Sequence, residues 1–373
     1  MKVSCFLLLL FVSSNSFAQV PAYGSSKTTD IASWNLFWYG HPSYGSTNNS
    51  KQRAGVAEVI RNSRVDIWFF QEVVDSSDLT AVLNESGTFG HIYSNYWQDQ
   101  KIGIAWNAAN WFLVSDSQLF PQNPASFASG RLPLFAHLVS LDYADTLFLI
   151  GIHLKAHTGT DEKKRASYFN RRESAMLLNQ WQVSHPAKKV IIAGDWNDDI
   201  DQSNYQDTLS PFSQVMDESG EYLFEKESYA GENSWYYGNS MIDHIWVNAS
   251  IYASFKPNSQ KILPLDWYLN AYPSEVSDHF PIFASFYPDK PVGLSTIEDG
   301  IGLYPNPSKG SAHLIGLVPG DLVVLFSTFG QRVSEYRPNA MNEVEFSGLQ
   351  TGSYFVQVCR GEQVFYYRLV VNP

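Results

Sequence analysis

Short apolar runs alternate with polar segments over the first 287 residues. The runs predict buried strands at 30–37, 65–70, 101–106, 111–114, 145–152, 190–193, 242–247 and 281–286. Helical spacing of apolar residues predicts helices at 51–62, 76–86 and 161–184. The core-facing side chains of the last helix are expected to be Phe169, Ala175, Met176, Leu177 and Trp181. Strands and helices that alternate, with several antiparallel stretches, indicate an α+β fold rather than a wound parallel sheet.

The pattern changes after residue 287. Residues 288–300 are rich in Pro, Gly and acidic residues, which is typical of a linker. From residue 301, short β-runs at 312–317, 321–327, 344–346, 354–358 and 364–371 are separated by turn residues and predict a small β-sandwich. We therefore expect a large domain at 19–287 and a small one at 301–373.

The first 18 residues have the pattern of a secretory signal peptide. One lysine precedes an apolar run at 6–12, and the small residues Ser16 and Ala18 favour cleavage before Gln19. This segment is too short to stay as a membrane anchor, and no other run approaches eighteen apolar residues. Cys5 lies within it, which leaves Cys359 alone. An exported chain without a disulfide must be held by a real hydrophobic core.

The charge of the chain constrains its substrate. The 373 residues have a formal net charge of −12. An acidic protein that acts on a polyanion needs local basic patches and bound divalent cations. The segment 155–189 offers such a patch, because it holds eight of the 25 basic residues. The part of it at 163–172 is expected to bind a phosphate backbone with little sequence preference.

A glycine and two side chains that can bind a metal ion follow the strand at 190–193. Gly194 lets the backbone turn, and Asp195 and Asn197, two apart on extended chain, project to the same side. A carboxylate and a carboxamide offer hard oxygens to a Mg²⁺-like ion and hydrogen bonds to a water or phosphate oxygen. A simple turn explains this tetrapeptide equally well, because Asp and Asn favour turns.

Four other strand ends carry residues suited to metal or phosphate. They are Asn35, Glu72, His153, and Asp243 together with the Ser277-Asp278-His279 run. A glutamate that ends a buried strand is costly unless paired or metal-bound, so Glu72 is the best metal carboxylate. An ion pair with an arginine is its alternative. A histidine beside a carboxylate can take a proton near neutral pH. For each histidine alone a structural role is the better explanation, and the ordered set of motifs reverses that preference.

These residues, in this order, resemble the endonuclease/exonuclease/phosphatase superfamily, the fold of pancreatic deoxyribonuclease. The resemblance spans roughly residues 28–287 and implies a four-layer α/β/β/α sandwich with the site at the sheet ends. His153 stands where the abasic-site repair branch tends to have tyrosine, and Met-Ile-Asp-His at 241–244 stands where the inositol-phosphatase branch usually has Trp-x-Asp-Arg. The resemblance is therefore to the deoxyribonuclease-like branch of secreted nucleases, which the HLKAH stretch also resembles.

The resemblance also implies a ligand set. Glu72 is the principal ligand of Mg²⁺ or Mn²⁺, and Asn35 and Asp278 assist it. Arg131, beside an apolar strand, and Lys155 are expected to bind the substrate phosphate. A surface role explains Arg131 equally well.

The remaining residues have catalytic roles by the same resemblance. Asp195 and Asn197 orient the attacking water or bind the phosphate. His279, held by Asp243, acts as general base or stabilises the pentavalent phosphorus. His153 protonates the leaving oxygen or binds the phosphate. The sequence does not identify its carboxylate partner, for which residue 99 is a weak candidate.

The C-terminal domain carries a second resemblance. LYPNPSKG at 303–310, GLQTGSYFVQV at 348–358 and the final YRLVV resemble the C-terminal sorting domain of type IX secretion in Bacteroidetes. This implies export across the outer membrane by the type IX machinery. An ordinary carbohydrate-binding or adhesive sandwich is the alternative.

The sequence thus predicts a secreted, monomeric, divalent-metal-dependent phosphodiesterase, best explained as a nuclease acting on extracellular DNA or RNA. A phosphatase or a sphingomyelinase-like lipid phosphodiesterase of the same fold is the alternative. The sequence has no evident exposed apolar hairpin, which argues against a lipid substrate. Residues 221–240 are rich in Tyr and Trp and could serve as such a hairpin. A non-catalytic surface adhesin is a further alternative, against which the filled motif positions argue.

Overall fold

The computed structural model describes residues 19–141, 143, 145–206, 208–216, 220–222, 233–238, 240–288, 300–328, 330–361 and 363–372. The expected signal peptide and nearly all of the expected linker lie outside these ranges, so both stay predictions. Within the described residues, no helix has the length and apolar character that crossing a membrane requires.

Two six-stranded mixed sheets form the large domain. The first has the order β11 (Lys261–Ile262), β12 (Ile282–Phe286), β1 (Thr29–Tyr39), β2 (Ile67–Val73), β4 (Lys101–Asn107) and β3 (Phe89–Tyr93). The second has the order β5 (Trp111–Gln118), β6 (Leu134–Ser140), β7 (Thr146–His153), β8 (Lys189–Asp195), β10 (Asp243–Asn248) and β9 (Gly220–Tyr222). The pairs β1–β2 and β7–β8 are parallel. The other named pairs are antiparallel, which makes both sheets mixed.

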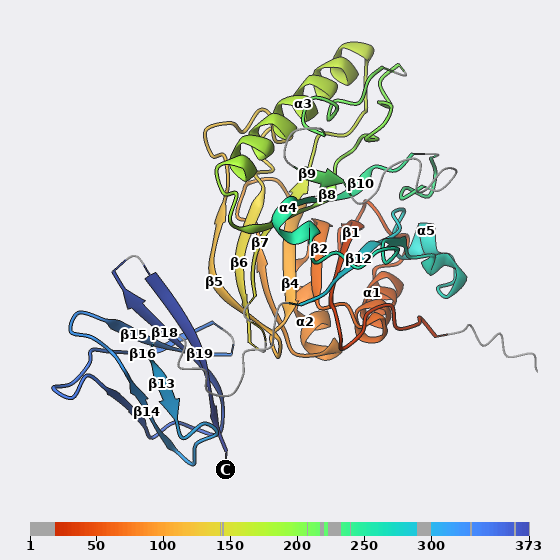
Figure 1. Cartoon of the computed structure of the whole chain (residues 1–373). Helices are drawn as coiled ribbons and strands as arrows, with labels where there is room; N and C mark the ends of the chain where they lie inside the picture. Colours follow the sequence, from red (N-terminus) through yellow and green to blue (C-terminus); the bar gives the residue numbers. More distant parts are fainter. Residues whose placement is uncertain are drawn as a thin grey trace, which may run out of the picture.

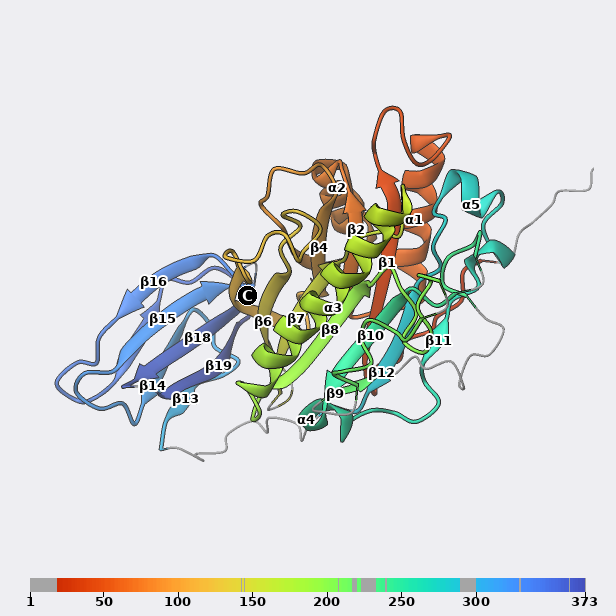
Figure 2. The same cartoon turned by 90° about the horizontal axis from the view of Figure 1, so that it is seen from above.

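Helices cover the outer faces of both sheets. The helices α1 (Asn49–Ser63) and α2 (Ser76–Ser86) lie on the first sheet, and α3 (Asp161–Val183) lies along the second (Figures 1 and 2). Three short elements, α4 (Ala249–Tyr252), η2 (Leu265–Trp267) and α5 (Tyr272–Glu275), lie in the connections between later strands. This arrangement confirms the expected four-layer sandwich.

Strand alternation divides the apolar side chains among three slabs of core. Ile31, Phe69 and Ile191 point between the sheets, where they pack in one cluster. Their neighbours Trp68 and Ile192 point outward, to the helices of their own side. The inner slab holds the two sheets face to face, so any inner-face residue at the end of a strand lies between them.

The expected buried face of α3 is wrong for two residues. Phe169 and Met176 are 46% and 42% exposed. The fully buried apolar residues are Ala175 and Leu178, and the polar Ser174 is fully buried beside them. Ser174 satisfies its hydroxyl by donating to the Ser126 carbonyl at 2.7 Å. Buried polar residues on this face hide it from a reading based on apolar spacing alone.

The C-terminal residues form two antiparallel sheets. One contains β13 (Gly302–Tyr304), β14 (Ser311–Ile315) and β17 (Val344–Ser347). The other contains β16 (Arg332–Tyr336), β15 (Leu322–Ser327), β18 (Gly352–Arg360) and β19 (Gln363–Val371). Leu314, Phe346 and Val356 pack together between them. The expected small all-β region is confirmed, with β13 and β16 as additional strands.

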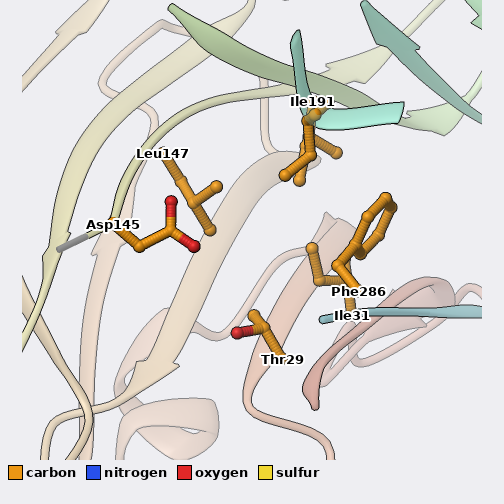
Figure 3. Close-up of a pocket in the computed structure, with 7 residues that line it drawn as sticks. Thr29, Ile31, Asp145, Leu147, Ile191 and Phe286 are labelled. Atoms are coloured by element: carbon orange, nitrogen blue, oxygen red, sulfur yellow. The ribbon is translucent and has the colours of Figure 1, made fainter. Parts of the chain in front are cut away.

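A crevice lies where β1, β7 and β8 begin (Figure 3). It is lined by Thr29, Ile31, Asp145, Leu147, Ile191, Ile251 and Phe286. The Asp145 carboxylate pairs with the Lys189 ammonium at 2.9 Å. The rest of the lining is almost wholly apolar, so the chemistry predicted from the sequence must lie at the opposite ends of these strands.

Asp66 makes the stability of this domain depend on pH. Its carboxylate accepts hydrogen bonds from the Asp30 amide at 2.9 Å and from Asn110 Nδ2 at 3.1 Å. Burial, together with the charge of Asp30, raises the pKa of Asp66 to about 7. The folded chain therefore keeps this proton to higher pH than the unfolded chain. The stabilisation from proton uptake is complete at acid pH and is lost as pH rises towards 7.

We expect Asp66→Asn to flatten the decline in the free energy of unfolding between about pH 4 and pH 7, because the substituted side chain cannot release a proton. Urea unfolding at a series of pH values measures this slope. Asp116→Asn, which changes an exposed carboxylate on β5, is the matched control and should leave the slope unchanged. An unaltered slope in Asp66→Asn would contradict the assignment.

Candidate active site

Four polar residues continue the inner-face alternation at the strand ends. They are Asn35 on β1, His153 on β7, Asp195 on β8 and Asp243 on β10, each an even number of positions from an inner-face apolar residue of its strand. All four are buried. His153 is paired in register with Asp195, and Asp195 with Asp243. Three chemical groups therefore stand side by side on the second sheet, with Asn35 facing them from the first.

Asp195 is the centre of this arrangement. Its Oδ2 accepts a hydrogen bond from Asn35 Nδ2 at 3.0 Å. The same oxygen lies 3.5 Å from His153 Nε2 and 4.0 Å from His279 Nε2. Its Oδ1 accepts from the Asn197 amide at 2.8 Å. Burial, and then the neighbouring carboxylate of β10, raise the pKa of Asp195 to about 7.

The turn after β8 depends on close backbone packing. A Cβ atom on Gly194 would lie 2.0 Å from the Ile152 carbonyl oxygen, so no other residue fits there without a shift. Asn197 follows in the left-handed region with φ of 56°. Its Nδ2 donates to the Leu154 carbonyl at 3.1 Å, which orients the amide towards the end of β7. The Gly-Asp-Trp-Asn run is therefore built into the turn.

Glu72 reaches the site through a strained backbone. Phe69 faces the inner core, so regular alternation would turn residue 72 outward. Instead Glu72 has φ of 58°, at a break in register between Phe70 and Val73. Its Oε2 accepts from the Trp38 amide at 2.9 Å. Burial raises the pKa of its carboxyl, and the nearby negative charge of residue 278 adds to the shift.

His279 forms a buried pair with Asp243. Its Nδ1 lies 2.8 Å from Asp243 Oδ2, which leaves Nε2 facing the centre of the site. Burial opposes the imidazolium form, but Asp243 outweighs it and raises the pKa of His279 to about 10. The backbone is fixed too, because the His279 carbonyl accepts from Trp34 Nε1 and Tyr272 Oη, and its amide donates to Ser277 Oγ.

Asp278 joins the site from the segment before β12. Burial raises the pKa of its carboxyl. Its Oδ2 accepts a hydrogen bond from Trp235 Nε1 at 3.2 Å. Trp235 is a site residue that the sequence did not predict, and its one signal was its place in an aromatic run at 235–237.

Arg131 lies against His153. The Nη1 atom is 2.7 Å from His153 Nδ1, and Nη2 donates to the Leu154 carbonyl at 2.9 Å. Burial, and then the guanidinium charge, hold the pKa of His153 well below its ordinary value. Asp195 Oδ2 is the nearest carboxylate oxygen to the ring, so the expectation of a pairing with Asp99 finds no support. Lys155 is half-buried, and burial, followed by the charge of Arg131, lowers its pKa.

Arg171 is not part of an exposed basic patch, so that expectation is wrong for this residue. Its guanidinium is fully buried and donates to Asp198 Oδ2 from Nε at 3.1 Å and from Nη2 at 2.7 Å. Its Nη1 donates to the Lys155 carbonyl at 2.7 Å. Arg171 therefore ties the loop after β7 to the loop after β8, the two loops that follow His153 and Asp195.

The donor atoms fit a divalent cation. Among the described residues, the side chains of Asp195, Asp243 and His279 have ligand atoms that all lie within 4.8 Å of one another, whereas the resemblance implies Glu72, Asn35 and Asp278 as the ligands. Within the part of the chain that the structure describes, Asp243 Oδ1 is buried without a hydrogen-bond partner. The carboxyl pKa values of Glu72 and Asp278 are also raised by burial. A bound cation would relieve this burial of negative charge, and carboxylate oxygens are what Mg²⁺ or Mn²⁺ prefers.

Comparison with family models agrees with this geometry. Residues 32–279 match the Endonuclease/Exonuclease/phosphatase family. The chain belongs to this family. As a member of the endonuclease/exonuclease/phosphatase family it is a hydrolase that acts on phosphate ester bonds. Residues 302–372 match the secretion system C-terminal sorting domain, which indicates type IX secretion and so an extracellular or cell-surface location.

Solved structures of the family share the fold at low identity. D. rerio TDP2 complexed with single-strand DNA product is 14% identical, with 69% of this chain and 98% of that chain covered and a TM-score of 0.51. The human Nocturnin catalytic domain with bound sulfate is 15% identical, with 72% of this chain and 96% of that chain covered and a TM-score of 0.50. An endonuclease/exonuclease/phosphatase from Bacteroides vulgatus is 16% identical, with 70% of this chain and 99% of that chain covered and a TM-score of 0.53. No curated protein matches the chain.

We expect Arg171→Ala to destabilise this endonuclease/exonuclease/phosphatase domain by about 3–5 kcal/mol, because it leaves the fully buried Asp198 carboxylate without its cation. Chemical unfolding measures the loss. Arg172→Ala is the matched control one residue along α3, since Arg172 Nε donates to Gln214 at the surface. Its expected cost is below about 0.5 kcal/mol. Equal losses in the two variants would contradict the role given to the buried pair.

Proposed function

We propose that this enzyme is a secreted, divalent-metal-dependent phosphodiesterase that hydrolyses the backbone of extracellular DNA or RNA and acts as a monomer. The observation that carries the proposal is the position of Asp195. Its carboxylate lies between His153 and His279 and is held by Asn35 of the opposite sheet. One chain supplies every one of these groups, so the site needs no second subunit.

The cation would be Mg²⁺ or Mn²⁺, held by Glu72 and Asp278 with help from the amide oxygen of Asn35. That oxygen already accepts from the Phe37 amide at 2.9 Å, which fixes the direction of its remaining lone pair. When bound, such an ion neutralises the charge that develops on the phosphate oxygens and makes water more acidic. Glu72 is the principal ligand in this assignment. The Trp38 amide holds its Oε2, so Oε1 is the oxygen that would bind the ion.

The remaining side chains handle the phosphate and its protons. Asp195, with Asn197 beside it, orients a water in line with the phosphorus and accepts its proton as the water oxygen bonds to phosphorus. The bond from phosphorus to the leaving oxygen breaks, and that oxygen takes a proton from solvent. His279, kept cationic by Asp243, donates a hydrogen bond to a phosphate oxygen as negative charge grows there. His153 serves in binding the phosphate rather than as the acid, because the guanidinium beside it repels a second positive charge.

Nucleic acid is the substrate that the surroundings of the site favour. Arg131, buried against His153, and the half-buried Lys155 place two cations in and beside the site, in a chain whose net charge is −12. Such local cations let an acidic protein approach a polyanion. The similar D. rerio TDP2 structure is a complex with a single-strand DNA product, which also supports this class of substrate.

The test of this proposal is a turnover assay of residues 19–373 with Mg²⁺, Mn²⁺ or chelator. The substrates are supercoiled plasmid, single-stranded RNA, sphingomyelin vesicles and a phosphate monoester. We expect plasmid nicking or RNA cleavage that chelator abolishes, because the carboxylates need their ion. Turnover of sphingomyelin or the monoester alone would transfer the function to a lipid phosphodiesterase or a phosphatase.

We expect Glu72→Gln and His279→Ala each to lower kcat by at least about 10²–10³, because each removes a group needed when charge develops on the phosphate. Steady-state rates at saturating metal measure this. Glu173→Gln, an exposed change on α3, is the control and should retain full activity. Comparable rates in Glu72→Gln and the wild type would overturn the metal assignment.

A further inference from the structure

A short aromatic segment, 233–238, is anchored to the active site. Its Trp235 forms an isolated antiparallel bridge with His279. On either side of this bridge, the Tyr236 amide donates to the Asp278 carbonyl at 2.7 Å, and the Phe280 amide donates to a carbonyl of the segment at 2.7 Å. The Ser234 hydroxyl of the segment also accepts a hydrogen bond from the Asp243 amide. These bonds fix its position relative to the catalytic residues.

The Trp235 ring is held beside the metal carboxylate but is not buried. Its Nε1 donates to Asp278 Oδ2, while 36% of the residue is exposed. Gly238 lies against the ring, where a Cβ atom would come within 2.4 Å of Trp235 Cε3. One part of the indole is therefore supported from within the segment, and another part is open to solvent next to the site.

Two more aromatic residues extend this surface. Tyr237 is 60% exposed, and its ring centroid lies 6.2 Å from that of Trp235. Tyr236 packs on Phe280 at 5.7 Å and is itself exposed in part. A contiguous group of exposed aromatic residues beside a site is typical of a surface that binds a ligand. The chemistry assigned above to the phosphate makes no use of these rings.

We propose that Trp235 is a stacking platform for an unpaired nucleobase next to the scissile phosphodiester. The inference rests on the proposed nuclease function and deepens it. Aromatic side chains bind single-stranded nucleic acid by stacking on the flat faces of its bases, with little dependence on sequence. A base inside a duplex already has both faces covered by its neighbours. The preferred substrate class is therefore single-stranded DNA or RNA, or unpaired ends.

The hydrogen bond of Trp235 distinguishes a base from a lipid as the occupant. A side chain that inserts into a bilayer has to stand clear of the polar groups of the site. The Trp235 indole instead donates to the carboxylate of Asp278, which holds the ring against a residue of the proposed metal site. A nucleobase is joined to the reacting phosphate through its sugar, so it is the apolar flat group that comes within reach.

The experiment compares three substrates of one length: a single-stranded oligothymidylate, an oligomer of abasic tetrahydrofuran units with the same phosphodiester backbone, and a fully paired duplex. For the wild type we expect the lowest KM on the oligothymidylate. Trp235→Ala should raise that KM by about 5- to 100-fold, the effect of losing one stacked base. On the abasic oligomer its KM should stay unchanged.

Trp235→Phe separates stacking from the hydrogen bond. It keeps a flat ring but cannot donate to Asp278, so we expect nearly normal KM on the oligothymidylate. Any fall in kcat should be equal on the base-bearing and abasic substrates. Gly238→Ala moves the indole without removing it and should raise the same KM, which keeps the inference testable if Trp235→Ala fails to fold. Tyr252→Ala, an exposed aromatic at the other end of β10, is the control and should have no effect.

An equal change of KM on the base-bearing and abasic oligomers would overturn the stacking role and leave Trp235 as a positioning residue for Asp278. In that case cleavage of both oligomers by the wild type would leave the nuclease function intact. Failure of the wild type to cleave any oligomer, with turnover of sphingomyelin or a monoester, would overturn the proposed function and the stacking inference together.

Discussion

The hydrogen bond from Asn35 Nδ2 to Asp195 Oδ2 joins the inner faces of the two sheets at the ends that carry the chemistry. Both residues occupy positions that strand alternation directs between the sheets, where apolar residues such as Ile31 and Ile191 fill the rest of the space. The inner slab of core therefore sets the distance across the site. A buried carboxylate in this place is tolerated only because an amide and two imidazoles surround it.

The raised pKa values in the site follow from the burial of several carboxylates close together. The pKa values of Glu72, Asp195 and Asp278 all rise on burial, and that of His279 rises because it is the partner of Asp243. At Glu72 the backbone enters the left-handed region and the regular pairing of β2 with β4 is interrupted. This strained turn brings one more carboxylate into the site. Such an arrangement stores unfavourable free energy that a cation can release.

The residue pattern was sufficient for the α+β class and for the residues that stand on strands, and the family resemblance supplied the layer order. Asn35, His153 and Asp195 could be found because period-two alternation and strand ends are local features. The turn of Glu72 could be guessed only from its chemistry, since a positive φ leaves no mark in the pattern. The polar part of the buried face of α3 escaped prediction because Arg171 is buried only through its pairing with Asp198, a residue 27 positions away. The position of Trp235 beside the site likewise depends on contacts with residues distant in the sequence, so its role could not be predicted locally.

The order of strands has a consequence for when activity can arise. The first strand of the chain, β1, pairs with the last strand of the large domain, β12, with Ile31 opposite Ala284. His279 and Asp278 come just before β12, so they reach the site only when this final strand docks. A chain still being synthesised, or one held unfolded, has most of the catalytic residues but no assembled centre. The pairing of β1 with β12 thus brings the two ends of the large domain together, and the catalytic centre is complete only when both strands are in place.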